Sequence, residues 1–261
     1  MYTQCIHVVK GAPAAPRAPP RLRMERGVPI LREMADENEA KAGPRSRSRA
    51  RRGPQLGEDN ARAMILTGAA SVFADRGTRS VSVEAILTAA GVSRRTFYRF
   101  YKGKEGVMEA LYSVGIDALL SASRYRTRGA EGPLQAFGRC LDAYLGNAKA
   151  MGRLVYVLGG EAQNQESSLY AHRIAALDTL VEILVESTRE QGIDVDPWVF
   201  RSLFLALESM TRATLQAADE GRAMTTEAVE RTRRVLMRLG TAAIAGEGPG
   251  VAPLPPDPGS P

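Results

Sequence analysis

Within residues 93–104, five cationic side chains and four aromatic rings occur together, and no Asp or Glu interrupts them. On a helix that advances about 100° per residue, Arg95 and Arg99 lie nearly opposite Phe97, so they point to solvent when Phe97 packs inward. Cationic side chains bind phosphates, and the planar fork of an arginine also matches the O6 and N7 acceptors of guanine. These residues predict a helix that buries aromatic rings on one face and lies against DNA with the other.

Two short helices around a tight turn must position this cationic face. Ser82 and Ser93 are suitable N-caps, because a serine hydroxyl can accept a hydrogen bond from a free backbone N–H in the first turn. Gly91 is suited to ending the first helix, since a left-handed backbone costs little for a residue without Cβ. The apolar residues expected to pack beneath the turn are Ile86, Ala90, Val92, Phe97 and Phe100. The pattern predicts a helix-turn-helix whose second helix is the recognition helix.

Residues 62–112 resemble the DNA-binding domain of the tetracycline-repressor (TetR) family of bacterial regulators. The resemblance is carried by the run Ala90-Gly91-Val92-Ser93-x-x-Thr96-Phe97-Tyr98-x-x-Tyr101-x-x-Lys104. It implies that the helix-turn-helix occupies the second and third helices and that the lysine begins the fourth. One position departs from the family pattern, because Leu87 stands where the family usually has a small residue against the following helix.

The resemblance also assigns roles within this run. It implies base-reading side chains at Arg94 and Arg95, and phosphate contacts at Thr96, Tyr98 and Lys104. With the two serine caps and the outward arginine of the same helix, the expected DNA-binding residues are Ser82, Ser93, Arg94, Arg95, Thr96, Tyr98, Arg99 and Lys104.

Charge is unevenly distributed along the 261 residues. Residues 1–60 carry twelve Lys or Arg against seven Asp or Glu, and residues 61–112 carry eight against four. Residues 113–261 carry fifteen against eighteen, so the basic balance belongs to the front of the chain. This distribution suits a phosphate-bearing partner at the front and a different role behind.

Both ends of the chain have the composition of tails. Thirteen of the fifteen prolines lie within residues 1–54 and 249–261, which predicts disordered segments at 1–57 and 246–261. The first of these ends in an arginine-rich run at residues 45–52. Two interpretations of that run are open: a solvated linker, or a basic arm that follows the DNA backbone or minor groove.

No stretch approaches the roughly eighteen apolar residues of a membrane span, and the N-terminus has no apolar signal core. Cys5 and Cys140 lie in a tail and in an apolar helical pattern, which favours neither a disulfide framework nor a metal site. The expected location is the bacterial cytoplasm, in association with the nucleoid.

Apolar residues recur at helical spacing through the rest of the chain, and no run alternates as a strand does. A first helix is expected over 58–75, and a longer one over 104–123 joins it to further helices behind. Asp196 with Pro197, and later Thr225, are predicted to start the last two helices. The fold class is therefore all-α, with about nine helices. The expected domains are a helix-turn-helix domain at 58–112 and a helical effector-binding and dimerisation domain at 113–245.

Signatures of enzymes are absent from the sequence. It contains no HExxH, CxxC, GxSxG, P-loop or GxGxxG motif. A helical bundle could hold a di-metal carboxylate site, but the Glu-x-x-His pairs of such sites are missing. His172 is the one histidine outside the front tail, and a single His makes a poor metal site. We expect no enzyme activity, no metal and no cofactor.

Large side chains in residues 113–245 have two interpretations, because ligand pockets and plain cores share the same composition. The candidates for a pocket lining are Tyr144, Met151, Tyr156, Glu161, Trp198 and Phe204. Two apolar stripes at matching helical spacing predict a four-helix dimer interface between the last two helices of each subunit. The residues of those stripes are Leu203, Leu207, Met210, Thr232, Leu236 and Leu239.

The hypothesis that joins these observations is a homodimeric DNA-binding transcriptional regulator. A two-fold dimer implies a roughly palindromic operator. By resemblance, the regulator is a repressor that a small, largely apolar ligand releases from DNA. The alternative is a constitutive or architectural DNA-binding protein without an effector, and an internal cavity in the second domain would favour the first interpretation.

Overall fold

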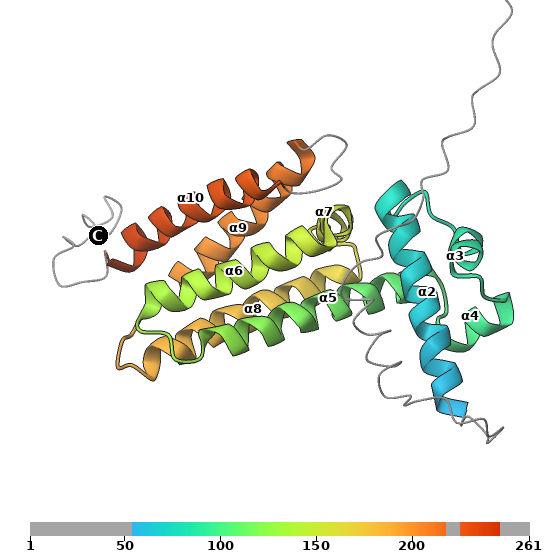
Figure 1. Ribbon diagram of the computed structural model, residues 1–261, viewed down its shortest axis with the longest axis horizontal. Coiled ribbons are helices and arrows are strands. Elements are labelled where there is room, and N and C mark those ends of the chain that lie inside the picture. The colour runs from blue at the N-terminus through green and yellow to red at the C-terminus, as the bar shows by residue number, and fades with distance from the viewer. Residues whose placement is uncertain (1–53, 218–224, 246–261) are drawn as a thin grey trace, which may run out of the picture.

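The computed structural model describes residues 54–217 and 225–245. Within those ranges the chain forms nine α-helices and no strand (Figure 1), which confirms the all-α fold class. The expected tails, with the arginine-rich run at 45–52 and Cys5, lie outside the described residues except for 54–57, which begin the first helix.

Helices α2 (Pro54–Arg76), α3 (Val83–Ala90) and α4 (Arg94–Phe100) form one end of the molecule (Figure 1). The predicted caps are confirmed: Ser82 Oγ accepts a hydrogen bond from the Ala85 N–H at 3.2 Å, and Ser93 Oγ accepts one from the Thr96 N–H at 3.1 Å. Gly91 ends α3 with a φ of 64°, the left-handed conformation expected of it.

The first two of these helices approach each other closely at Gly68. A Cβ atom at Gly68 would lie 2.6 Å from the backbone nitrogen of Ala90, so no larger residue fits there without moving α3. Leu87, the position that departs from the family pattern, is buried in the same core. The two-helix crossing is therefore set by a glycine on α2, and it accommodates a leucine on α3.

Helix α5 (Lys104–Thr127) leaves this end and runs along α6 (Pro133–Met151) and α8 (Leu169–Arg189) (Figure 1). Helices α9 (Pro197–Ala217) and α10 (Thr226–Ala245) complete the bundle. Both predicted starts are confirmed. Asp196 Oδ1 accepts from the Trp198 N–H at 2.8 Å, and Thr225 Oγ1 accepts from the Ala228 N–H at 3.2 Å.

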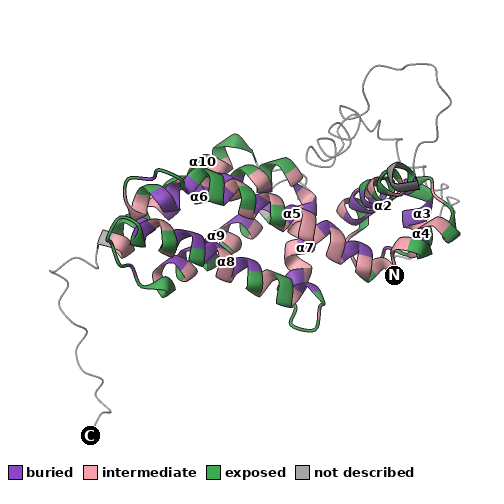
Figure 2. Cartoon of the chain, turned by 90° about the horizontal axis from the view of Figure 1, so that it is seen from below, coloured by how far each residue is buried: buried purple, intermediate pink, exposed green. Residues whose placement is uncertain are grey.

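The short helix α7 (Arg153–Ala162) joins the two ends of the molecule. The larger core lies between α5, α6, α8, α9 and α10, and the smaller one lies beneath the helix-turn-helix. Leu154 and Leu158 of α7 belong to the smaller core, together with Phe73 of α2. Figure 2 shows α7 where the two ends of the molecule meet, with most of its residues of intermediate burial. Helix α7 thus packs against the helix-turn-helix domain, although the domain boundaries expected from the sequence place it in the second domain.

Candidate functional site

Helix α4 separates an apolar inner face from a cationic outer face. Phe97 is fully buried, whereas Tyr98 is 50% exposed and meets the Phe97 ring edge-on, with 5.3 Å between ring centroids. Arg94, Arg95 and Arg99 are all exposed. The aromatic-in, cation-out arrangement expected from the spacing is therefore present.

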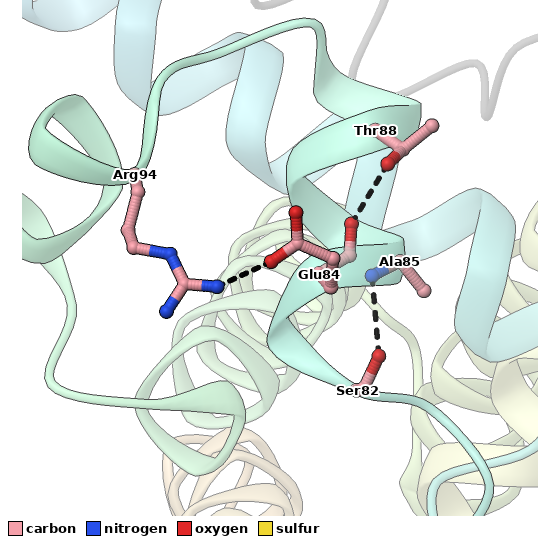
Figure 3. A network of polar contacts seen from close by, with 5 residues as sticks. All are labelled: Ser82, Glu84, Ala85, Thr88 and Arg94. Carbon is pink, nitrogen blue, oxygen red and sulfur yellow. Dashed lines mark hydrogen bonds and ion pairs between the residues drawn. The ribbon is translucent and has the colours of Figure 1, made fainter.

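Arg94 is not free on this face. Its Nη2 donates to Glu84 Oε2 of α3, an ion pair between two side chains that are each about two-thirds exposed (Figure 3). The backbone carbonyl of Glu84 also accepts from the Thr88 hydroxyl at 2.9 Å. Sequence reasoning missed this pair, because its partners are ten positions apart and lie on either side of the turn. Glu84 therefore occupies one arm of the Arg94 guanidinium.

Arg99 and Arg95 differ in their surroundings. Arg99 pairs with Glu58 of α2, and its guanidinium lies over the Phe100 ring, 5.5 Å from the centroid. The side chain of Arg95 makes no ion pair and no hydrogen bond with any residue in 54–217 or 225–245. Of the three outward arginines, Arg95 alone has no carboxylate partner among the described residues.

The remaining expected DNA-contact residues already have partners within the protein. The hydroxyls of Ser93 and Thr96 lie 2.8 Å apart. Lys104 Nζ donates to the carbonyl of Thr78 at 3.1 Å and to that of Arg79 at 3.4 Å. Lys104 therefore holds the segment between α2 and α3, a positioning role that its place at the start of α5 did not reveal.

A cavity of about 100 Å³ lies between helices α5 to α9. Of the six residues predicted to line a pocket, four do: Tyr144, Met151, Tyr156 and Phe204. The other two placements were wrong. Trp198 is 67% exposed, because it stands in the first turn of α9 at the surface. Glu161 lies on the side of α7 that faces the helix-turn-helix, where its Oε2 accepts from the Thr78 hydroxyl at 2.8 Å.

Three charged side chains line the cavity, and the sequence singled out none of them. Arg173 of α8 and Glu208 of α9 form a two-pronged, mostly buried ion pair, and the hydrogen bond to Glu208 raises the pKa of Arg173. Burial, with a further contribution from the Glu208 charge, raises the pKa of Tyr144, so its phenol stays protonated. The third charge is Arg212, whose guanidinium lies over the Tyr156 ring at 5.0 Å from the centroid.

Most of the residues predicted for a dimer interface pack inside their own subunit. Leu203, Leu207, Thr232 and Leu236 are at most 5% exposed, because α9 and α10 turn these positions toward α6 and α8. Leu239, at 47%, is the exposed member of the predicted set, and Met210 is half-buried. The exposed large apolar residues of these helices are Trp198, Leu205, Val235 and Leu239.

No group of three or more His, Cys, Asp or Glu in the described ranges is placed to hold a metal ion. His172 is exposed on α8. Among the same residues, no helix is both long and apolar enough to cross a membrane.

Residues 65–111 match the family model described as bacterial regulatory proteins, tetR family. The matched segment covers the helix-turn-helix and its supporting helices, from the middle of α2 to the start of α5. Over this segment the chain is similar to the TetR family. The relatives found for this chain are named as regulators.

One related protein is the HTH-type transcriptional activator FasR of Mycolicibacterium smegmatis, which is 27% identical over 114 residues. The aligned segment is 44% of this chain and spans about half, 52%, of FasR.

Solved structures share the fold over most of the described residues. The fatty acid degradation regulator FadR from Bacillus halodurans has a TM-score of 0.58 at 18% identity, covering 72% of this chain and 96% of that one. The TetR family transcriptional regulator PfmR from Thermus thermophilus has a TM-score of 0.52 at 23% identity, covering 68% and 95%. At these identities the likeness shows the fold alone.

Proposed function

We propose that this protein is a homodimeric TetR-family transcriptional regulator that places one α4 helix per subunit in the major groove of operator DNA. The observation that carries the proposal is the outer face of α4, where Arg95 is exposed and has no carboxylate partner among the described residues. An arginine that is free of protein acceptors can bind guanine O6 and N7 through both arms of its fork.

Selection from a random double-stranded DNA pool with the purified protein tests this proposal. We expect enrichment of one roughly palindromic site, with affinity that falls steeply as salt rises. Enrichment of no site, or of sites without two-fold symmetry, would contradict the proposed mode of binding.

We further propose that the protein acts in the bacterial cytoplasm as a repressor, although its relative FasR is named an activator. A reporter placed behind the selected operator distinguishes the two signs. If the protein is a repressor, deleting its gene should raise the reporter signal. If it is an activator, deleting its gene should lower that signal.

The proposed effector site is the cavity, and α7 supplies its connection to DNA binding. Leu154 and Leu158 line the cavity and also belong to the core beneath the helix-turn-helix. Arg153 Nε donates to the carbonyl of Ala74 at the end of α2 at 2.6 Å. A ligand that shifts α7 therefore shifts α2 as well. Helix α5, which continues from Lys104 directly into the bundle, supplies a second connection.

A ligand can release DNA only if it binds the DNA-incompetent arrangement more tightly. Typical coupling of about 1–3 kcal/mol would weaken operator binding by about 5- to 150-fold, and operator DNA would weaken ligand binding by the same factor. The lining is mainly apolar, which suits a largely apolar effector.

The hydrogen bond from Thr78 to Glu161 offers a direct test of this connection. It joins α7 to the segment that Lys104 holds at the base of the helix-turn-helix. Thr78→Val removes the donor with little change of shape. We therefore expect the affinity for operator DNA to change. The affinity of the cavity for a ligand, measured without DNA, should not change. A ligand that leaves the operator isotherm unmoved in the unmodified protein would favour the alternative, a constitutive DNA-binding protein.

For the dimer, we propose that a second copy covers the outward sides of α9 and α10. Their exposed apolar residues, among them Trp198, Leu205 and Leu239, are the support for this surface. Sedimentation of Leu205→Glu should show a folded monomer, whereas an unaltered dimer would place the interface elsewhere.

A further inference from the structure

The cavity contains one more positive charge than negative. Its charged lining residues are Arg173, Glu208 and Arg212, and the first two neutralise each other. No described carboxylate forms an ion pair with Arg212. Among the described residues, Arg212 is therefore a cation without a neutralising partner in a largely apolar space.

The guanidinium of Arg212 packs against a defined surface of α7. Tyr156 and Gly160 stand one helical turn apart, and the guanidinium lies over the Tyr156 ring and against the bare face of Gly160. A Cβ atom at Gly160 would lie 2.4 Å from Arg212 Nη1, so any larger residue there would displace the guanidinium. The position of the charge is thus defined by two neighbouring residues and not by an ion pair.

Two residues of the cavity lining carry buried donors without an acceptor among the described residues. Arg212 Nη1 and the hydroxyl of Thr211 are both buried without a hydrogen-bond partner among the described residues. Thr211 also lines the cavity. Buried donors of this kind destabilise a protein until an acceptor reaches them, and the effect is larger for a charged donor.

We propose that the cavity binds an organic monocarboxylate with a compact apolar body, whose carboxylate accepts hydrogen bonds from Arg212 and Thr211. A single negative charge would neutralise the cavity, and carboxylate geometry matches the two arms of a guanidinium. A phosphate dianion would leave an excess negative charge in apolar surroundings, which is unfavourable. This inference rests on the proposed function, because it names the chemical class of the effector.

The volume of the cavity limits the apolar body. A dry cavity of about 150 Å³ accepts benzene, so one of about 100 Å³ suits a chain of about five carbons. Hexanoate is therefore the probe, and hexanamide is its uncharged counterpart of nearly the same shape. Because the two compounds differ in charge and hardly in shape, a difference in their affinities reports recognition of the charge.

Titration calorimetry with the full chain measures both compounds without DNA. We expect hexanoate to bind about 10- to 100-fold more tightly than hexanamide, the usual difference for a hydrogen bond to a charged group. Arg212→Met should abolish that preference by weakening hexanoate, and leave hexanamide within about twofold. Arg212→Lys, which keeps the charge but not the fork, should retain part of the preference.

Arg201→Met is the matched control. Arg201 lies on the same helix and also over an aromatic ring, that of Trp198, but it pairs with Asp178 and lies outside the cavity. It should leave hexanoate affinity unchanged. Equal binding of hexanoate and hexanamide, or equal loss in both arginine variants, would overturn the inference.

Calorimetry and the DNA selection together separate this inference from the proposed function. A protein that selects an operator but does not prefer hexanoate refutes the carboxylate site and leaves the regulator standing. A protein that prefers hexanoate through Arg212 but selects no DNA confirms the site and refutes the regulator.

Discussion

Arg95 and Arg212 are both arginines without a carboxylate partner among the described residues, yet they lie in opposite environments. Arg95 is exposed on α4, where water and salt can reach it. Arg212 presents a fully buried Nη1 inside the bundle, against Tyr156 and Gly160. An exposed charge is screened within about 10 Å at 0.1 M salt, whereas a buried one is screened much less.

The difference indicates two kinds of recognition in one chain. A row of exposed cations suits a polyanion, whose binding gains from counterion release and depends strongly on salt. A single buried cation suits one anion of defined shape, whose binding depends on hydrogen-bond geometry and little on salt. The predictions below test this contrast, beginning with the largest expected effect.

Leu236→Asp and Leu239→Asp should behave differently, although the residues are three apart on α10. Leu236 is fully buried, so an aspartate there would destabilise the bundle by more than about 5 kcal/mol or unfold it. Leu239 is 47% exposed, so its variant should stay folded and affect only self-association. Urea denaturation and sedimentation measure the two effects. Equal stability of both variants would contradict the packing of α10.

Phe97→Ala and Tyr98→Ala test the two faces of α4. Phe97 is fully buried, and its truncation should lower the free energy of unfolding by about 3–5 kcal/mol. Tyr98 is half exposed, so its truncation should lower stability by less than about 1 kcal/mol and act mainly on DNA affinity. Chemical denaturation of each variant decides this. A larger stability loss at Tyr98 would reverse the assigned faces.

Arg95→Ala should weaken binding at one operator position by about 1–3 kcal/mol and relax its base preference. Lys104→Ala should instead weaken all sequences about equally and lower the salt slope by about one unit if the lysine contacts phosphate. Competition against a set of substituted operators measures both. Uniform loss for Arg95→Ala would reassign that side chain to the DNA backbone. An unchanged salt slope for Lys104→Ala would leave it the positioning role shown by its two carbonyl contacts.

Glu84→Gln should have the smallest effect on stability, below about 0.5 kcal/mol, because its ion pair with Arg94 is exposed. DNA affinity should nevertheless rise, since the substitution frees Arg94 and removes a negative charge from the DNA-facing side. Asp75→Gln is a control, because Asp75 is also an exposed acid paired with an arginine, outside α3 and α4. A similar rise for both variants would show a general charge effect.

The local features of the helix-turn-helix were predictable because each depends on a few neighbouring residues. The caps at Ser82 and Ser93, the turn at Gly91 and the burial of Phe97 follow from backbone hydrogen bonding and from the helical repeat. The ion pair between Glu84 and Arg94 was not predictable, because it depends on the angle between two helices.

In the second domain the helical stripes were predictable, but their directions were not. Leu207 and Leu236 have the spacing of an interface stripe, and only the packing of α9 and α10 against α6 and α8 shows that they face inward. Trp198 has the chemistry of a pocket residue, and its place at the start of α9 exposes it. A periodic pattern states that one side of a helix is apolar, without saying what covers that side.

The sequence by itself determined the all-α fold class, the helix-turn-helix and the cationic face of α4, since all of these arise from interactions within a few turns of the chain. Tertiary structure alone decided which cations remain unpaired. It brought Glu84 to Arg94, Glu58 to Arg99 and Glu208 to Arg173, and it left Arg95 and Arg212 without such a partner among the described residues. The physical reason is that ion pairing requires a few ångströms between side chains that lie ten or more residues apart in the chain, a distance that only packing of the helices can set.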